Sequence, residues 1–397
     1  MIHLSFNYLL NRYLCWCLGC VFQLYYLLGD LYTFCPFHAD PTFLSDFFTW
    51  LGCECRLYQH RKKSIIKSCD SLLKLVLWLL IASSDLASIK YLAFSSLQHY
   101  LKRWKVMNHL DLVKLTALME RTSGKPEIMV GLLDGPVASN HPDLESAHIR
   151  VIPGSIRGAC TQTRSAACLH GTFVAGILCA KRGSDAPAIC PNCTLLVRPI
   201  FAETQVGSLH MPGATPEELA AAILDSIRAG AHVLNLSVAL VQPSSTGQRE
   251  LEEALDYAAR RGVIVVAAAG NQGAVGSSAI TRHPWVIPVV AYDLRGRPIQ
   301  QSNLGGSIGR RGLGAPGDDV TSLGADGRPI TFGGTSVAVP FVTGAIALVW
   351  SQIPTVTAAE IKFAIIQVST QRRTTIVPPL LDAWAAYQLL LTMYERR

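Results

Sequence analysis

FGGTSVAVPFVTGAIALVW, residues 332–350, places two glycines and two hydroxyl side chains directly before a long apolar run. Ser and Thr are favoured at helix N-termini because their oxygens accept hydrogen bonds from N–H groups that have no partner within the helix. Pro340 is tolerated near the first turn, where its missing N–H costs least. The stretch therefore predicts a buried helix that begins beside Ser336. The serine itself has two interpretations, a helix cap or a nucleophile with the positive end of the helix dipole behind it.

Upstream of this helix, apolar runs alternate with amphipathic stretches. Helices are predicted at residues 215–230, where Thr215 and Glu218 form a capping box, and at residues 247–262, which end at Gly262. The apolar runs suit buried parallel strands and lie at residues 128–134, 194–201, 232–240, 263–270 and 286–292. We therefore predict an α/β fold with three layers, in which helices cover both faces of a mostly parallel central sheet.

Polar side chains follow or end several of these elements. Asp134 ends the first strand, His170 is expected at the mouth of a helix in the stretch 168–180, and Asn271 follows a later strand. Each has an ordinary interpretation, as a turn residue, a satisfied histidine or a residue that tolerates a left-handed backbone. Together with Ser336 they follow the order Asp, His, Asn, Ser, which is the order of one class of triad enzymes. We predict that Ser336 is the nucleophile, His170 its base, Asp134 the group that orients the imidazole, and Asn271 an oxyanion donor.

Six segments resemble the signatures of subtilisin-like serine proteases: LLDGPV, HGTFVAGI, LNLSVA, AAAGNQG, GAPG and GGTSVAVPFVTGAIAL. The resemblance extends over residues 126–392 and implies a subtilisin-like fold and serine endopeptidase activity. LLDGPV…HPDL and ICPNCTLLVRPIF (189–201) further resemble the proteases that mature cyanobactins, which are peptides made on the ribosome. This likeness implies that the enzyme removes a leader from a ribosomal precursor peptide. The alternatives are a broad degradative protease and a binding protein on a catalytically retired scaffold.

The resemblance also implies where a peptide substrate binds. The substrate would lie as an added strand between two walls, formed by Ser237, Val238 and Ala239 and by Ala268, Ala269 and Gly270. Ala239 stands where a glycine is usual, which changes the shape of the pocket. The last helix departs from the family pattern at Val337, Phe341 and Thr343, where Met, His and Ala are usual. None of these departures removes a catalytic group.

The sequence favours no metal and no cofactor. Many family members carry a calcium loop after the catalytic histidine, but residues 180–193 offer Asp185 as their only carboxylate, and calcium takes about six to eight oxygens. The nearby cysteines could bind zinc, form two disulfides or do neither. We favour disulfides or free thiols over zinc, because the spacing of the first pair is unusual for a zinc site. These cysteines are Cys160, Cys168, Cys190 and Cys193.

Residues 1–106 differ in character from the rest, since they hold 20 of the 32 aromatic residues. Their apolar segments at 13–29 and 72–83 are marginal or too short for a membrane span, and the start lacks a complete signal-peptide pattern. They could be a membrane-associated extension, a prodomain or translated upstream sequence. We favour the last, with a peptidase domain at residues 107–397. The expected partner is a peptide or protein in the cytoplasm, with membrane contact only through residues 1–106. The small basic surplus is no nucleic-acid footprint.

Overall fold

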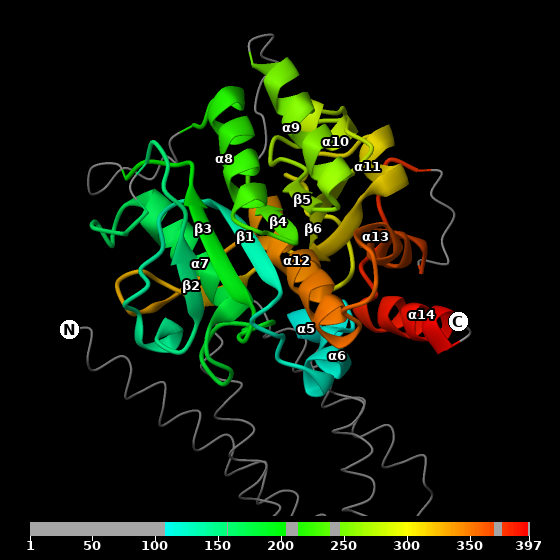
Figure 1. The fold of residues 1–397 in the computed structure, drawn as a ribbon, viewed down its shortest axis with the longest axis horizontal. Coiled ribbons are helices and arrows are strands. Elements are labelled where there is room, and N and C mark those ends of the chain that lie inside the picture. The colour runs from blue at the N-terminus through cyan, green and yellow to red at the C-terminus, as the bar shows by residue number, and fades with distance from the viewer. Residues whose placement is uncertain (1–107, 157, 204–212, 239–246, 369–374, 396–397) are drawn as a thin grey trace, which may run out of the picture. The chain divides into compact units, whose positions relative to one another are not determined.

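The computed structural model describes residues 108–397 except 157, 204–212, 239–246, 369–374 and 396–397 (Figure 1). The chain divides into two units, and every described residue belongs to the second, Lys105–Arg397. The predictions made for residues 1–106 lie outside the described residues. The helices are α5 (His109–Leu112), α6 (Leu115–Arg121), η1 (Pro142–Leu144), α7 (Ala166–Cys179), α8 (Pro216–Arg228), α9 (Gln248–Arg261), α10 (Ala279–Arg282), α11 (Gly306–Arg311), α12 (Thr335–Gln352), α13 (Ala358–Gln367) and α14 (Ala383–Glu395). The strands are β1 (Met129–Asp134), β2 (His148–Val151), β3 (Thr194–Pro199), β4 (Val233–Leu236), β5 (Ile264–Ala268), β6 (Val286–Tyr292), β7 (Leu313–Pro316), β8 (Val320–Leu323) and β9 (Pro329–Phe332).

The central sheet has seven strands in the order β2-β3-β1-β4-β5-β6-β7. Every neighbouring pair in it is parallel. Parallel neighbours need long crossover connections, and helix α7 lies in the one between β2 and β3 and α9 in the one between β4 and β5. Strands β8 and β9 form a separate antiparallel pair. The predicted α/β fold with a mostly parallel sheet is therefore confirmed.

Helices cover both faces of the sheet (Figure 1). Successive side chains of a strand point to opposite faces. In β1, Val130 and Leu132 pack in the core that contains α7 and α12, whereas Leu133 packs in the core that contains α8 and α9. The domain therefore has three layers, as predicted.

Helix α12 is the core helix expected from the opening stretch. Sixteen of its 18 residues are buried, which fits a helix that is apolar on every side. It is long and apolar enough to cross a membrane, but 89% of it is buried inside the domain. It begins after Gly334, whose φ of +125° is a conformation that glycine adopts without strain.

Several predicted elements differ in detail. Strand β4 ends at Leu236, well before residue 240, because its pairing with β1 ends there, next to the last residue of β1. Thr215 caps α8 by accepting a hydrogen bond from the Glu218 N–H, but the Glu218 carboxylate contacts Arg198 instead of closing the capping box. Helix α9 ends at Gly262 in a left-handed conformation, as predicted.

Candidate active site

Asp134, His170 and Ser336 form a continuous series of hydrogen bonds. Asp134 is the last residue of β1 and is fully buried, and its Oδ1 accepts a hydrogen bond from the Gly135 N–H at 2.6 Å. His170 lies in the second turn of α7, with Nδ1 2.8 Å from Asp134 Oδ1 and 3.0 Å from Oδ2. On the other side of the ring, Nε2 lies 3.0 Å from the Oγ of Ser336. The strand end, α7 and α12 thus bring together three residues that are far apart in the sequence.

The environment of His170 favours its protonated form. Burial lowers its pKa, but the charge of Asp134 and the hydrogen bond to that carboxylate outweigh burial and raise the pKa above 6.5. The imidazole is 14% exposed, and the Phe332 ring lies at 6.2 Å between centroids. An imidazolium formed here is therefore stabilised by a buried carboxylate.

The backbone around Ser336 is held by a polar series in the core. Because Pro340 has no N–H, it cannot donate the usual helical hydrogen bond to the Ser336 carbonyl. The Ser237 Oγ donates to that carbonyl at 3.4 Å. Asn235 Nδ2 donates to Ser237 Oγ at 2.8 Å, and Thr343 Oγ1 donates to Asn235 Oδ1 at 3.0 Å. Ser336 is thereby tied to β4 as well as to its own helix.

Asn271 lies beside the start of α12. Its Oδ1 accepts hydrogen bonds from the N–H and the Oγ1 of Thr335, both at 2.9 Å. These bonds use the oxygen, so the amide nitrogen remains as the donor end. A Cβ placed on Gly334 would lie 3.0 Å from that nitrogen, so a glycine here lets the amide approach the helix N-terminus. Thr335 is a site residue that our sequence analysis did not single out, although it directly precedes the predicted nucleophile.

The predicted groove residues lie at the carboxyl edge of two neighbouring strands. Ser237 and Val238 follow β4, while Ala268 ends β5 and is followed by Ala269 and Gly270. Ala239 lies outside the described residues. This edge of a parallel sheet is where ligands bind in open α/β folds. Contact between these residues and a substrate stays a prediction.

The four cysteines divide into one disulfide and two thiols. Cys160 and Cys168 are joined, which ties the loop before α7 to the first turn of that helix. Cys190 and Cys193 are buried free thiols, as is Cys179, whose pKa is raised by burial to about 12. The hydrogen bond between Cys190 and Cys193 raises the pKa of Cys190 and lowers the pKa of Cys193. A thiol with a raised pKa is a poor nucleophile and a poor metal ligand, because both roles need the thiolate. The structure thus contains one disulfide and free thiols at these positions, and the expectation of no zinc stays a prediction.

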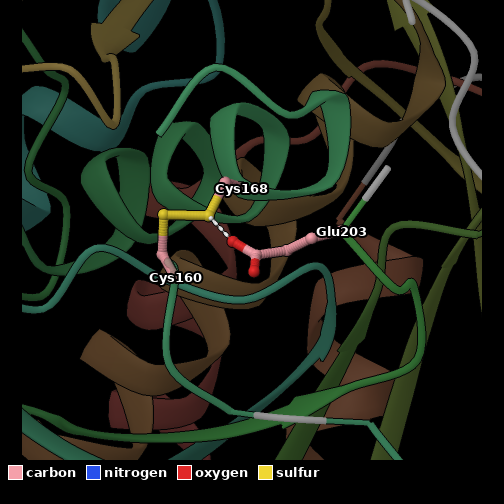
Figure 2. Close-up of side chains that lie close together, drawn as sticks. All are labelled: Cys160, Cys168 and Glu203. Carbon is pink, nitrogen blue, oxygen red and sulfur yellow. Dashed lines mark hydrogen bonds between the residues drawn. A yellow bond between two sulfur atoms is a disulfide. The ribbon is translucent and has the colours of Figure 1, made fainter. Parts of the chain in front are cut away.

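Among the described residues, one group of three potential metal ligands is closely spaced: Cys160, Cys168 and Glu203 (Figure 2). The two sulfurs are bonded to each other and carry no thiolate charge. Glu203 Oε1 accepts hydrogen bonds from the N–H groups of Thr161 and Gln162, both at 2.7 Å, and its Oε2 accepts from the Thr161 hydroxyl. In this form the group does not suit a cation, and Glu203 instead holds the loop that carries Cys160. Asp185, the other candidate ligand, is exposed.

Comparison with known proteins finds one matching family model and several similar proteases. Residues 125–380 match the model of the Subtilase family. The thermostable alkaline protease of Halalkalibacterium halodurans is 31% identical over 242 residues, which are 61% of this chain and 62% of that protein. Subtilisin DY of Bacillus licheniformis is 28% identical over 64% of this chain and 87% of its own length. The match thus spans less than two thirds of the first relative.

Two solved structures are similar over nearly their whole length. The protease domain of PatA is 29% identical, with a TM-score of 0.61, over 68% of this chain and 97% of that one. The prenylagaramide maturation protease PagA is 29% identical, with a TM-score of 0.61, over 70% of this chain and 98% of its own. The two matches therefore cover about two thirds of this chain and nearly all of each neighbour.

Proposed function

Because residues 125–380 match its model, the chain belongs to the Subtilase family, and we propose that it is a serine endopeptidase with Ser336 as its nucleophile. The observation that carries this proposal is the unbroken series of hydrogen bonds from Asp134 through His170 to Ser336. A serine hydroxyl is a weak nucleophile until a base within hydrogen-bond reach takes its proton. His170 is at that distance and Asp134 holds its other nitrogen.

The geometry gives each group a step. Ser336 Oγ attacks the scissile carbonyl while His170 Nε2 takes the hydroxyl proton, and the same proton then passes to the leaving amine. Asp134 keeps the ring in the tautomer that carries hydrogen on Nδ1 and stabilises the imidazolium. Water then attacks the acyl-enzyme with His170 again as the base. This returns Ser336 to its free hydroxyl and releases a carboxylic acid.

The negative charge on the tetrahedral oxygen needs donors that are already oriented. Asn271 Nδ2 is one, because Thr335 fixes the other end of the same amide. The Ser336 N–H is the second, since it lies in the first turn of α12, where N–H groups have no partner within the helix. The loss of one such donor costs about 3 to 4 kcal/mol in comparable enzymes.

We infer that the substrate is a ribosomal precursor peptide from which a leader is removed. Similarity to maturation proteases over almost their entire chains supports this inference. An extended peptide would add to the sheet edge beside Ser237 and Ala269, where main-chain bonds supply affinity. The curated relatives named alkaline protease and subtilisin support the second candidate, a protease of broad specificity.

A fluorophosphonate probe tests the nucleophile without knowledge of the substrate. We expect one label per chain on Ser336 in the wild type and none in Ser336→Ala of equal thermal stability. Labelling at another serine would refute the assignment. A second assay compares a precursor peptide encoded beside this gene with fluorescent casein. A single cut in the precursor with intact casein supports maturation, whereas extensive casein digestion supports broad specificity.

A further inference from the structure

Asn303 binds the loop that carries Asn271. It lies between β6 and α11, and its Oδ1 accepts hydrogen bonds from the N–H groups of Gln272 and Ala274, both at 3.0 Å. Its Nδ2 donates to Gln272 Oε1 at 2.7 Å, and its own N–H donates to the Gly270 carbonyl at 2.8 Å. The residue before Asn271 and the residue after it are therefore both bonded to Asn303.

The loop and Asn303 are fitted closely to each other. Gly270 has a φ of +107°, and a Cβ placed on it would lie 2.3 Å from Asn303 Nδ2. Only a glycine permits both the conformation and the approach. Asn303 is half-buried, and the three hydrogen bonds of its side chain to the loop are exposed to solvent.

Asn271 is thus held from two directions. Thr335 fixes its side-chain oxygen from α12, and Asn303 fixes the backbone on both sides of its Cα. Thr335 Oγ1 also accepts a hydrogen bond from the Gly270 N–H at 3.2 Å. Rotation of the Asn271 amide is limited by Thr335. Displacement of the loop is limited by Asn303 together with two backbone hydrogen bonds, from the Gly273 N–H to the Gln301 carbonyl at 2.8 Å and from the Leu304 N–H to the Ala274 carbonyl at 2.9 Å.

We propose that Asn303 is a positioning residue that sets the location of the Asn271 amide for transition-state stabilisation. This inference rests on the proposed function, since it requires Asn271 to act on the oxyanion. The oxyanion forms only in the transition state, so a misplaced donor lowers kcat and leaves ground-state binding nearly unchanged. A displacement of about 1 Å can cost on the order of 10²-fold in rate. We expect Asn303→Ala to lower kcat by about 10- to 100-fold, with KM changed by less than about two-fold.

A double-mutant cycle separates positioning from general destabilisation. The probe is p-nitrophenyl acetate, and kcat is normalised to active sites titrated with a fluorophosphonate, so unfolded protein is not counted. If Asn303 acts through Asn271, Asn303→Ala should cost less than about two-fold in the Asn271→Ala background. Asn303→Ser serves as a milder variant if Asn303→Ala yields too little folded protein.

Asp293→Ala is the matched control. In the wild type, Asp293 Oδ1 also accepts hydrogen bonds from two backbone N–H groups, those of Arg295 at 3.0 Å and Arg297 at 2.9 Å. These bonds lie in a turn that is separate from the Asn271 loop. We expect it to lower thermal stability and leave kcat unchanged. Equal losses of kcat from Asn303→Ala in both backgrounds, or no loss in the wild type, would overturn the inference. If Ser336→Ala retains wild-type turnover, the proposed function itself is wrong, so the two failures are distinguishable.

Discussion

Replacing Asp134 with Asn tests the electrostatics of the site with almost no change in shape. In the wild type the carboxylate accepts hydrogen bonds from the Gly135 N–H and from His170 Nδ1, at 2.6 and 2.8 Å. An asparagine can keep the first through its oxygen, but its NH₂ group then takes the place of Oδ2, 3.0 Å from Nδ1, where it competes with that oxygen as a hydrogen-bond donor to the ring. The ring is driven towards the tautomer with hydrogen on Nε2, which cannot accept the proton of Ser336.

The expected loss is large. A wrong tautomer in a comparable triad lowers kcat by about 10⁴-fold, which corresponds to about 5.4 kcal/mol of transition-state stabilisation. Labelling of Ser336 by a fluorophosphonate should slow to a similar extent, because it needs the same proton transfer. The fold should persist, since the buried oxygen that contacts Gly135 remains.

The pH dependence gives an independent check with a definite sign. In the wild type the pKa of His170 lies above 6.5, so activity should rise through a pKa above that value and stay high beyond it. The folded wild type binds this proton more tightly than the unfolded chain, so the pair's contribution to stability is complete below pH 6.5 and is lost as pH rises through the folded-state pKa. In Asp134→Asn only burial remains, which lowers the pKa and reverses this slope.

The assays are p-nitrophenyl acetate hydrolysis and urea unfolding of both proteins, each measured from pH 5 to 9. Turnover of Asp134→Asn within about ten-fold of the wild type, or the same slope of stability with pH in both proteins, would contradict this role of Asp134.

Three further changes test the scaffold. Arg198 is 2% exposed and pairs with two partly exposed carboxylates. Arg198→Met should therefore lower the free energy of unfolding by about 3 kcal/mol. An unchanged midpoint in urea titrations would contradict this. Cys160→Ser removes the disulfide between residues that are 8 positions apart in the sequence. Because the unfolded chain then regains its loop entropy, the free energy of unfolding should fall by about 2.6 kcal/mol. A reductant should destabilise the wild type and leave the variant unchanged. Thr343→Val leaves the buried Asn235 oxygen without its donor and should lower the free energy of unfolding by about 1 to 3 kcal/mol. Thr343→Ser keeps the hydroxyl and should retain most of this stability. Thermal unfolding of both variants measures the difference.

The sequence was most informative where periodicity and chain position coincide. The buried strands that contain Asp134 and precede Asn271 were visible as apolar runs, and the parallel arrangement then placed their ends at one edge. The helix at Ser336 was visible from its glycines and its apolar length. These features are local, or follow from general rules of sheet topology, and so they could be predicted.

The contacts that hold the site in place could not be predicted in the same way. Asn303 lies 32 residues beyond Asn271 in a turn without hydrophobic periodicity, and only the folded chain shows its bonds to Gln272 and Ala274. The strands β2 and β7 and the β8–β9 pair have four residues each, as β4 does, but they do not lie within a long apolar run such as the one that marked β4. The Cys160–Cys168 pairing was one of several options, because spacing alone does not fix connectivity.

The departures of helix α12 from the family pattern can be explained by its place in the folded chain. Val337, Phe341 and Thr343 are all fully buried, so each change alters packing around Ser336 rather than the proposed reacting groups. Phe341 adds an apolar ring where a polar histidine is usual, and a buried ring needs no hydrogen-bond partner. Thr343, two residues later, brings a hydroxyl that donates to Asn235. The buried amide oxygen of Asn235 therefore keeps a donor, and Asn235 in turn donates to Ser237, which donates to the Ser336 carbonyl.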